Sequence, residues 1–370
     1  MINNLKRYEV AVINYPLMDP RIKVDDYAAY FDLEYKTNDP WRVPVYIHIP
    51  FCSKICKFCI YHRELPDSSG SILQRYTEAL MKEIRMYGST EYIRSSKIGA
   101  IFFGGGTPSC LSAGQLTDII KTCREYLPLE PDVEITTECN IINTNEEKIR
   151  RLYEAGVTRI STGVQTFNPK YRSLLGLTIP AEKVDQWIEM VNRYPFHDVA
   201  IDLLYGLPGQ TYAEWFSEIE TALSRPVTHF SLYLLTVFAY TELYQEIRQG
   251  LVPPLPEEET IYQMLTGGDK IFSERGFYLQ TNQEYSQNGK KVRFWDLTYD
   301  GYGDNLSFGA FSFGFINGIN YQNEPDPNKY IAMLENDSFP VCKTSGKATY
   351  EQLMERAMIL GFRRSYVEQS

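Results

Sequence analysis

The chain has 370 residues, 44% of them hydrophobic and 23% charged, with a formal net charge of −10. This is an ordinary globular composition with length for one large domain or two, and an acidic chain without a Lys/Arg-rich tract is not expected to bind nucleic acid. The sequence has no apolar run of 18 residues and no signal-peptide pattern, so we expect a soluble, cytoplasmic protein that does not bind a membrane.

Residues 1–44 are weakly patterned, and we interpret them as an N-terminal lead-in with a short helix at 27–31 and a turn at 38–41. From Tyr46 onward, short apolar runs alternate with stretches of helical periodicity. Strands are expected at 46–49, 98–103, 133–137, 159–164, 199–205 and 230–235, and helices at 72–87, 116–126, 146–155, 181–194 and 213–224. This α/β alternation predicts a parallel sheet, and right-handed crossovers would curl it into a partial (β/α)6 barrel.

The pattern changes after residue 236. A proline-rich linker at 253–256 precedes a predicted helix at 257–274, and residues 277–320 are rich in Gly, Asn, Tyr and Phe, which favours short strands and loops. A last helix is expected at 350–359. We therefore predict a barrel domain at 45–245 and a smaller C-terminal α+β domain at 246–370, which would form a lid over the barrel mouth and contact the substrate.

Three cysteines follow the first predicted strand: Cys52, Cys56 and Cys59, in a Cys-x3-Cys-x2-Cys spacing. Iron–sulfur clusters are held by cysteine thiolates, usually four, so a loop with three leaves one iron open to another ligand. The spacing leaves two alternatives, a zinc site completed by His62 and an unrelated group of thiols. A disulfide is disfavoured, because three cysteines cannot pair off and no secretory signal is present.

A glycine triplet, Gly104, Gly105 and Gly106, follows the second predicted strand and precedes Thr107. Glycines let a backbone approach a ligand closely and adopt positive φ, although a tight strand-to-helix turn produces the same pattern.

Polar side chains occupy the next strands at or near their carboxyl ends: Glu138, Gln165 and Asp202. Ligands of parallel α/β folds bind at that edge, and a carboxylate suits ribose hydroxyls or an amino group. A surface role for Glu138 is the alternative. Asp202 lies within an apolar strand, where a carboxylate is costly unless it is paired.

Five motifs together resemble one family. They are Tyr46-x-His-Ile-Pro-Phe-Cys52, the cysteine spacing with Phe58, Gly-Gly-Gly-Thr-Pro at 104–108, Ser-x-Gly-x-Gln at 161–165, and Asp-Leu-x-Tyr-Gly-Leu-Pro-Gly-Gln-Thr at 202–211. They resemble the radical S-adenosylmethionine (SAM) superfamily, in the branch of the oxygen-independent coproporphyrinogen III oxidases, over about residues 45–236.

The resemblance implies a [4Fe–4S] cluster on Cys52, Cys56 and Cys59, with SAM on the open iron and reductive cleavage to a 5′-deoxyadenosyl radical. It implies one or two SAM molecules, a small-molecule substrate and an electron donor such as flavodoxin or ferredoxin. The SAM contacts that it implies are Tyr46, Gly104, Gly105, Gly106, Thr107, Glu138, Gln165 and Asp202.

Three positions depart from the family pattern. Tyr61 stands where coproporphyrinogen oxidases have a fourth cysteine. Leu177 stands where those enzymes have an arginine that helps to hold SAM. Residues 290–295 lack the histidine of the haem-ligand motif found in the related haem chaperones. We therefore expect a radical SAM enzyme, methyltransferase-like or oxidoreductase, that uses two SAM molecules for C-methylation or cyclopropanation of a natural product or tetrapyrrole. Coproporphyrinogen-type oxidative decarboxylation and a non-catalytic haem chaperone are the alternatives.

Overall fold

The computed structural model describes residues 15–18, 42–281, 283–299 and 303–363. Strands and helices alternate through the first part of the chain, as predicted. The strands are β1 Arg42–Ile49, β2 Lys97–Gly105, β3 Leu129–Cys139, β4 Arg159–Gln165, β5 Asp198–Tyr205 and β6 His229–Leu234. The helices are α1 Ser71–Gly88, α2 Glu91–Arg94, α3 Ala113–Tyr126, α4 Glu146–Glu154, α5 Pro169–Leu174, α6 Ala181–Val191 and α7 Tyr212–Leu223, with 3-10 turns η2 Pro108–Cys110 and η3 Ile141–Asn143.

The remaining elements are α8 Glu242–Arg248, α9 Glu258–Glu274, β7 Phe277–Leu279, β8 Glu284–Gln287, α10 Arg293–Thr298, β9 Leu306–Phe308, β10 Phe313–Ile316, β11 Ile319–Asn323, α11 Pro327–Glu335, β12 Val341–Thr344 and α12 Tyr350–Gly361. The predicted helix at 27–31 and turn at 38–41 lie outside the described residues.

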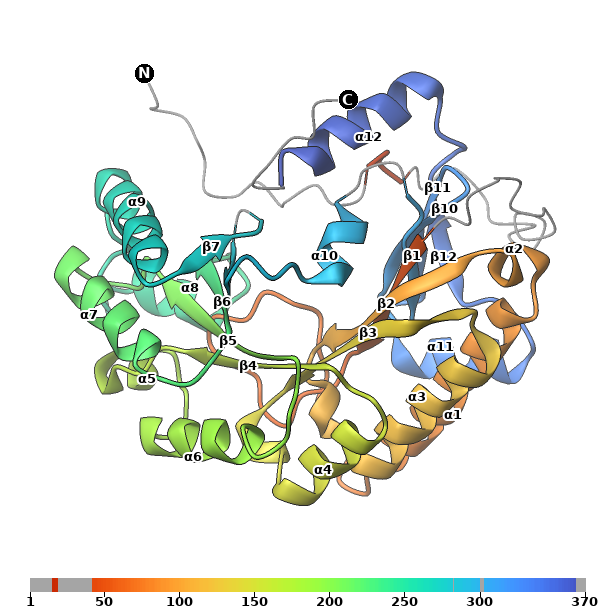
Figure 1. Cartoon of the computed structure of the whole chain (residues 1–370), viewed down its shortest axis with the longest axis horizontal. Helices are drawn as coiled ribbons and strands as arrows, with labels where there is room; N and C mark the ends of the chain where they lie inside the picture. Colours follow the sequence, from red (N-terminus) through yellow and green to blue (C-terminus); the bar gives the residue numbers. More distant parts are fainter. Residues whose placement is uncertain (1–14, 19–41, 282, 300–302, 364–370) are drawn as a thin grey trace.

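One nine-stranded sheet organises the molecule, in the order β7-β8-β6-β5-β4-β3-β2-β1-β9. Strands β1 to β6 are parallel and follow one another in sequence order. The sheet curves, and helices such as α3, α4, α6 and α7 cover its outer face (Figure 1). This arrangement confirms the predicted α/β fold with a partial barrel.

Local sequence signals set the ends of several helices. Ser112 caps α3 through a capping box with Gln115, which satisfies backbone N–H groups that the first helical turn leaves unpaired. Gly156 follows α4 with φ +90°, a backbone conformation that residues other than glycine rarely adopt. The strands contribute buried side chains such as Ile101, Ile135 and Ile160 to the hydrophobic core between sheet and helices.

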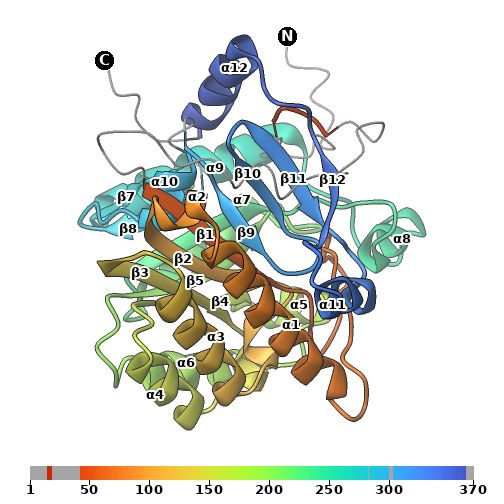
Figure 2. The same cartoon turned by 90° about the vertical axis from the view of Figure 1, so that its right-hand side faces the viewer.

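The C-terminal part of the chain joins the same sheet at both edges. Strand β8 pairs antiparallel with β6, and β9 pairs parallel with β1. A separate three-stranded sheet, β10-β11-β12, lies beside β9 and α11 (Figure 2). The predicted division near residue 245 therefore stays a prediction about function, since strands from both sides of it build one sheet.

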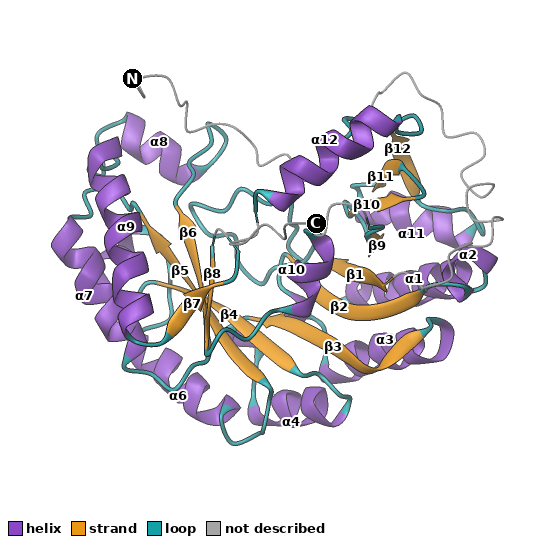
Figure 3. Cartoon of the chain, turned by 45° about the horizontal axis from the view of Figure 1, so that its top comes forward, coloured by secondary structure: helices purple, strands orange, loops and turns teal. Residues whose placement is uncertain are grey.

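Helix α10 packs against the inner face of the sheet, opposite the outer helices (Figure 3). The Phe294 ring lies 4.9 Å from the Phe102 ring of β2, measured between centroids, and both belong to an apolar cluster with Ala100 and Val292. Glu134 on β3 accepts hydrogen bonds from the backbone N–H groups of Arg293 (3.0 Å) and Phe294 (3.1 Å), which fixes the start of the helix. Side chains therefore fill this part of the barrel interior.

A buried carboxylate ties helix α1 to the C-terminal elements. Glu83 has no exposed surface and accepts hydrogen bonds from the Gly309 N–H (2.8 Å), the Asn323 amide (2.7 Å) and the Tyr330 hydroxyl (2.5 Å). Two turns earlier in α1, Tyr76 donates to the His48 carbonyl at 2.8 Å. These contacts join α1 to β1, β11 and α11.

Among the described residues, no helix combines the length and apolar character needed to span a bilayer.

Candidate active site

The cysteine loop leaves the end of β1 and closes on itself. Cys52 N–H donates to the Glu64 carbonyl at 2.9 Å, and Glu64 N–H donates to the Pro50 carbonyl at 2.7 Å, so the two ends of the loop are held together. The glycine turn after β2 holds the same point, because Thr107 N–H donates to the Phe51 carbonyl at 2.8 Å. The Thr107 hydroxyl lies 3.4 Å from the Cys52 sulfur. Two predicted motifs therefore meet here.

The far side of the loop is anchored to α8 and to the turn after α5. Lys57 forms ion pairs with Glu246 and Glu242, and its carbonyl accepts a hydrogen bond of 3.0 Å from Leu243 N–H. Phe58 packs into an apolar cluster that includes Tyr171, Leu175, Leu204, Leu207 and Leu243. An aromatic residue before the last cysteine thus serves to seat the loop on the barrel.

The three thiols suit an iron–sulfur cluster as a donor set. All are free and half-buried, and burial, followed by the neighbouring Cys59 and Cys52, raises the pKa of Cys56 to about 11. Such thiols lose their protons as metal binds. In the described part of the chain, no three His, Cys, Asp or Glu side chains are grouped to hold a single metal ion. His62, the fourth ligand of the zinc alternative, stacks on Phe311 with ring centroids 4.6 Å apart.

The glycine triplet leaves room only for backbone. A Cβ on Gly104 would lie 3.1 Å from a Glu138 carboxylate oxygen and 3.1 Å from the Tyr46 ring. Gly105 has φ +111°, and a Cβ there would lie 2.7 Å from the His48 ring. A Cβ on Gly106 would lie 2.8 Å from the Phe51 carbonyl oxygen. The triplet is therefore required for β1, β2 and β3 to come together at this edge.

Gln165 ends β4 in a strained conformation. Its φ is +68°, which is uncommon for a residue other than glycine. Its amide nitrogen lies 2.4 Å from the place that a Cβ of Gly163 would occupy, so the side chain folds back over its own strand. Backbone strain of this kind gathers at functional sites. The geometry is consistent with the predicted SAM contact.

Two half-buried carboxylates face the barrel interior from β3 and β5. Burial, and then the charge of Asp202, raises the pKa of Glu138 to about 8, while Gly105 donates a backbone hydrogen bond to it. Burial, and then the charge of Glu284, raises the pKa of Asp202 to about 7. Ser161 donates to Asp202 at 3.4 Å. Each carboxyl group is thus poised to ionise when a cation such as the sulfonium of SAM comes near.

Tyr46 and His48 occupy the inner face of β1. The Tyr46 hydroxyl lies 3.2 Å from His48 Nδ1, and its ring packs near Phe102. Burial, with a contribution from His62, lowers the pKa of His48 to about 3, so the imidazole is neutral. His48 Nε2 is buried without a hydrogen-bond partner among the described residues.

Sequence reasoning missed a second set of polar residues on the inner face. Glu284 of β8 forms a hydrogen bond with His229 and an ion pair of 3.9 Å with Arg159, and it accepts a hydrogen bond of 3.1 Å from Ser231. Arg159 begins a predicted strand and His229 directly precedes one, but nothing in the sequence indicates that they meet. Glu284 lies in a Gly/Asn/Tyr-rich stretch, and only the antiparallel β6–β8 pairing brings it into the barrel.

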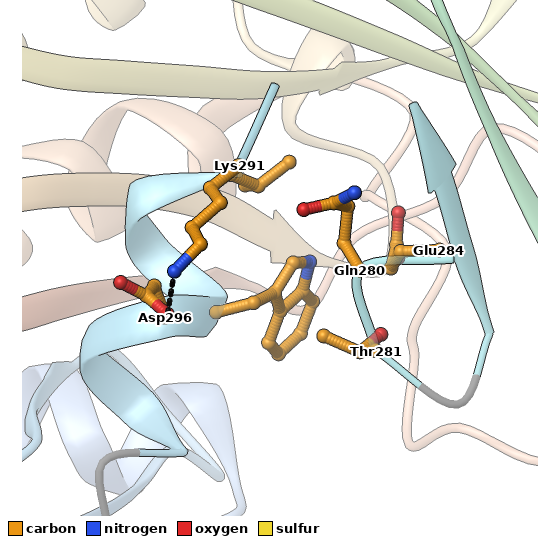
Figure 4. A pocket seen from close by; sticks show the side chains of 7 residues that line it. Gln280, Thr281, Glu284, Lys291 and Asp296 are labelled. Carbon is orange, nitrogen blue, oxygen red and sulfur yellow. Dashed lines mark ion pairs between the residues drawn. The ribbon is translucent and has the colours of Figure 1, made fainter. Parts of the chain in front are cut away.

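A small cavity lies between α10 and the β7–β8 hairpin, and Gln280, Thr281, Glu284, Lys291 and Asp296 line it (Figure 4). Its volume of about 10 Å³ suits one water molecule. Lys291 and Asp296 form an ion pair of 3.9 Å beside it. The cavity is too small to hold an organic substrate.

The three departures from the family pattern take different places. The Tyr61 side chain is 61% exposed at the surface. Leu177 packs into the apolar cluster beneath Phe58. The nearby guanidinium of Arg172 donates to the carbonyls of Thr166 and Ile179, both at 2.6 Å. In residues 290–295, where the haem-ligand histidine is missing, Lys290 donates a hydrogen bond to the His197 carbonyl at 3.4 Å.

Comparisons with known proteins agree with this geometry. A model of the radical SAM superfamily matches residues 46–222. The anaerobilin synthase of Escherichia coli O157:H7 is 34% identical over 291 residues, which cover 78% of this chain but 64% of the relative, less than two thirds of its length. The heme chaperone HemW of Bacillus subtilis is 31% identical over 323 residues, 86% of this chain and 83% of that protein.

A solved structure shares the fold. The coproporphyrinogen III oxidase HemN of Escherichia coli, described as a radical SAM enzyme, superposes with a TM-score of 0.77 at 20% identity, over 88% of this chain and 76% of that one. Members of the family bind a [4Fe–4S] cluster and SAM, and these cofactors are therefore those of this chain. The chain belongs to the radical SAM superfamily, in the branch that contains the oxygen-independent coproporphyrinogen III oxidases and the heme chaperones HemW.

Proposed function

We propose that this chain is an enzyme that cleaves SAM reductively and directs the radical at a tetrapyrrole. When bound, the [4Fe–4S] cluster supplies the electron that breaks SAM into methionine and a 5′-deoxyadenosyl radical. The observation that carries the proposal is the junction of three motifs at one edge of the sheet. Thr107 contacts Cys52, and Gly104 packs against Glu138.

The chain's own residues have separate tasks in this proposal. Cys52, Cys56 and Cys59 would each ligate one iron. The backbone of Gly104–Gly106 would approach the methionine part of SAM, where no side chain fits. Glu138 and Asp202 would accept hydrogen bonds from its amino group and ribose hydroxyls, and the Gln165 amide would orient it. Holding the reacting carbon near its target is the protein's main contribution to such chemistry.

The names of the relatives support a tetrapyrrole as the substrate. One is named for making anaerobilin, a bilin, and others for chaperoning heme. Tyr61 stands in place of the fourth cysteine of coproporphyrinogen oxidases, which argues against oxidative decarboxylation. We therefore favour carbon transfer from a second SAM molecule, as C-methylation or cyclopropanation, with flavodoxin or ferredoxin as the electron donor in the cytoplasm.

Anaerobic reconstitution tests whether the chain cleaves SAM. The purified protein is loaded with iron and sulfide, mixed with SAM and dithionite, and assayed for 5′-deoxyadenosine by liquid chromatography. The Cys56→Ala variant should make none, because one iron loses its ligand. The matched control is Cys342→Ala, whose thiol lies on β12, away from the cysteine loop, and it should retain activity. Absence of 5′-deoxyadenosine from the wild-type protein would refute the enzyme reading.

The products test the second part. With heme as the substrate, S-adenosylhomocysteine formed together with 5′-deoxyadenosine is expected from the two-SAM route. Loss of carbon dioxide from coproporphyrinogen, without S-adenosylhomocysteine, would establish decarboxylation instead.

A haem chaperone is the second candidate, favoured by the HemW relatives. Haem iron needs an axial ligand such as histidine or cysteine, and Lys290–Trp295 offers neither. Titration with hemin, followed by absorbance, distinguishes the two. A stable one-to-one complex that forms while SAM remains uncleaved would support the chaperone.

A further inference from the structure

Strand pairing aligns polar residues in a row across the inner face of the barrel. Gly163 of β4 pairs with Asp202 of β5, Asp202 pairs with Ser231 of β6, and Ser231 pairs with Glu284 of β8. Residues that pair across neighbouring strands point to the same side of a sheet. Glu284 therefore points to the same face of the sheet as Asp202, although it lies on β8, which pairs antiparallel with β6.

A single hydroxyl group lies between the two carboxylates. Ser231 donates to Glu284 at 3.1 Å, and it is also within hydrogen-bonding reach of Asp202. Ser161 approaches Asp202 from the other side at 3.4 Å. A serine hydroxyl has one proton to donate, so the two carboxylates share one donor. A change at Glu284 must therefore alter the hydrogen bonding of Asp202.

Arg159 and His229 contact Glu284 at Oε2, the same carboxylate oxygen that accepts the hydrogen bond from Ser231. The side chains of Arg159, His229 and Glu284 are 3%, 1% and 6% exposed. His229 Nε2 bonds the carboxylate, while Arg159 Nε and His229 Nδ1 have no hydrogen-bond partner among the described residues. Ion pairs buried this deeply cost desolvation energy and are often replaceable by apolar side chains without loss of stability. Stability alone is therefore a weak reason for this network.

We propose that Glu284 is a positioning residue for SAM, which holds Asp202 through Ser231 and is itself held in place by Arg159 and His229. The inference rests on the proposed function, because it takes Asp202 as a SAM contact. It adds a residue from outside the matched range 46–222 to the cofactor site. Glu284 itself need not touch SAM.

The direct test is the dissociation constant of SAM for the reconstituted protein, measured by equilibrium dialysis for wild type and Glu284→Gln. Loss of a hydrogen bond to a charged group predicts about ten- to a hundredfold weaker binding. Glu130→Gln is the matched control. Glu130 is a buried carboxylate near the start of β3, paired with Arg42 at 2.8 Å and with Arg293 at 3.6 Å, and its loss should leave SAM binding unchanged.

The pH dependence supplies a readout that a structural role would not change. SAM should bind more tightly as the pH rises and Asp202 ionises. Because the charge of Glu284 raises the pKa of Asp202, the Glu284→Gln variant should show the pH midpoint of this change in affinity at a lower pH. The Glu130→Gln midpoint should match wild type. The titratable and charged groups that face Asp202 from the surrounding elements are Glu138, Arg159, His229, Tyr233, Glu284 and Tyr61.

The outcomes separate the two proposals. Wild-type affinity and midpoint in Glu284→Gln would overturn the positioning role. If that variant does not fold by circular dichroism, Ser231→Ala decides instead, with weaker SAM binding expected and unchanged binding contradicting the inference. A wild-type protein that binds SAM but never cleaves it would refute the proposed function, while the affinity comparison still decides the role of Glu284.

Discussion

At the scale of single residues, burial raises the pKa of several carboxyl groups toward neutral pH. Glu83, Glu138 and Asp202 are clear cases, and in each the largest cause of the raised pKa is burial. Glu138 and Asp202 face the barrel interior, where we predict that SAM binds. Glu83 has no such ligand, and only the donors from Gly309, Asn323 and Tyr330 oppose the effect of burial on it.

Glu83 should make the protein less stable as pH rises. Burial raises its pKa to about 7 from the ordinary 4.5, so the folded state holds a proton that the unfolded state releases. Its contribution is complete below pH 4.5 and is lost as pH rises through 7, by on the order of 3 kcal/mol. Glu83→Gln should flatten this part of the dependence. Urea unfolding at pH 5 and pH 7.5 measures it, and an unchanged slope would contradict the assignment.

At the scale of elements, the turn after β2 decides how closely three strands approach. Gly105 combines a left-handed backbone with contact to the His48 ring, and Gly104 touches both Tyr46 and Glu138. The turn is therefore a structural requirement of the sheet edge. The sequence alone left a tight turn and a ligand contact as alternatives, and the contact with SAM stays a prediction.

Gly105→Ala should reduce both stability and SAM cleavage. Alanine at this position would have to keep a positive φ, which costs about 1–3 kcal/mol. Its Cβ would also overlap the His48 ring. Gly276→Ala is the control, because Gly276 has φ +78° but nothing within 4 Å of the added carbon. Thermal melts and the 5′-deoxyadenosine assay should separate them, with the control losing stability alone. Equal activity in both variants would show that His48 accommodates the methyl group.

The sequence predicts the parallel part of the fold well because its signals are local. Apolar runs and helical periods alternate from Tyr46 to Leu234, and cysteines, glycines and Gln165 fall at strand ends, where ligands bind. Glu284 and α10 could not be predicted in this way. Glu284 reaches the barrel only through the antiparallel pairing of β8 with Ser231 of β6. Helix α10 lies in the barrel interior because Phe294 packs against Phe102. Both depend on contacts between residues far apart in the chain.

At the scale of the whole molecule, the sheet is completed from the C-terminal part of the chain. Strand β8 covers the edge of β6, and β9 covers the edge of β1. Exposed strand edges pair with other chains and promote aggregation. Strands from both sides of the predicted boundary at residue 245 therefore build one sheet, and the boundary itself stays a prediction.

A chain that ends at residue 245 should not fold into a stable barrel. It lacks β7, β8 and β9, and it leaves two sheet edges and the inner surface of Phe102 uncovered. We expect most of it in the insoluble fraction, and no cooperative thermal transition in the remainder. Solubility and far-UV circular dichroism beside the full chain measure this. A soluble fragment with a cooperative melt would show that residues 45–245 fold independently.

The pairing of β1 with β9 also determines when, during synthesis, this edge of the sheet can be completed. Val45 meets Leu306, so the strand that carries the cysteine loop gains its outer neighbour only after most of the chain has left the ribosome. Until then that side of β1 is an open edge, and a strand edge of this kind can pair with another chain.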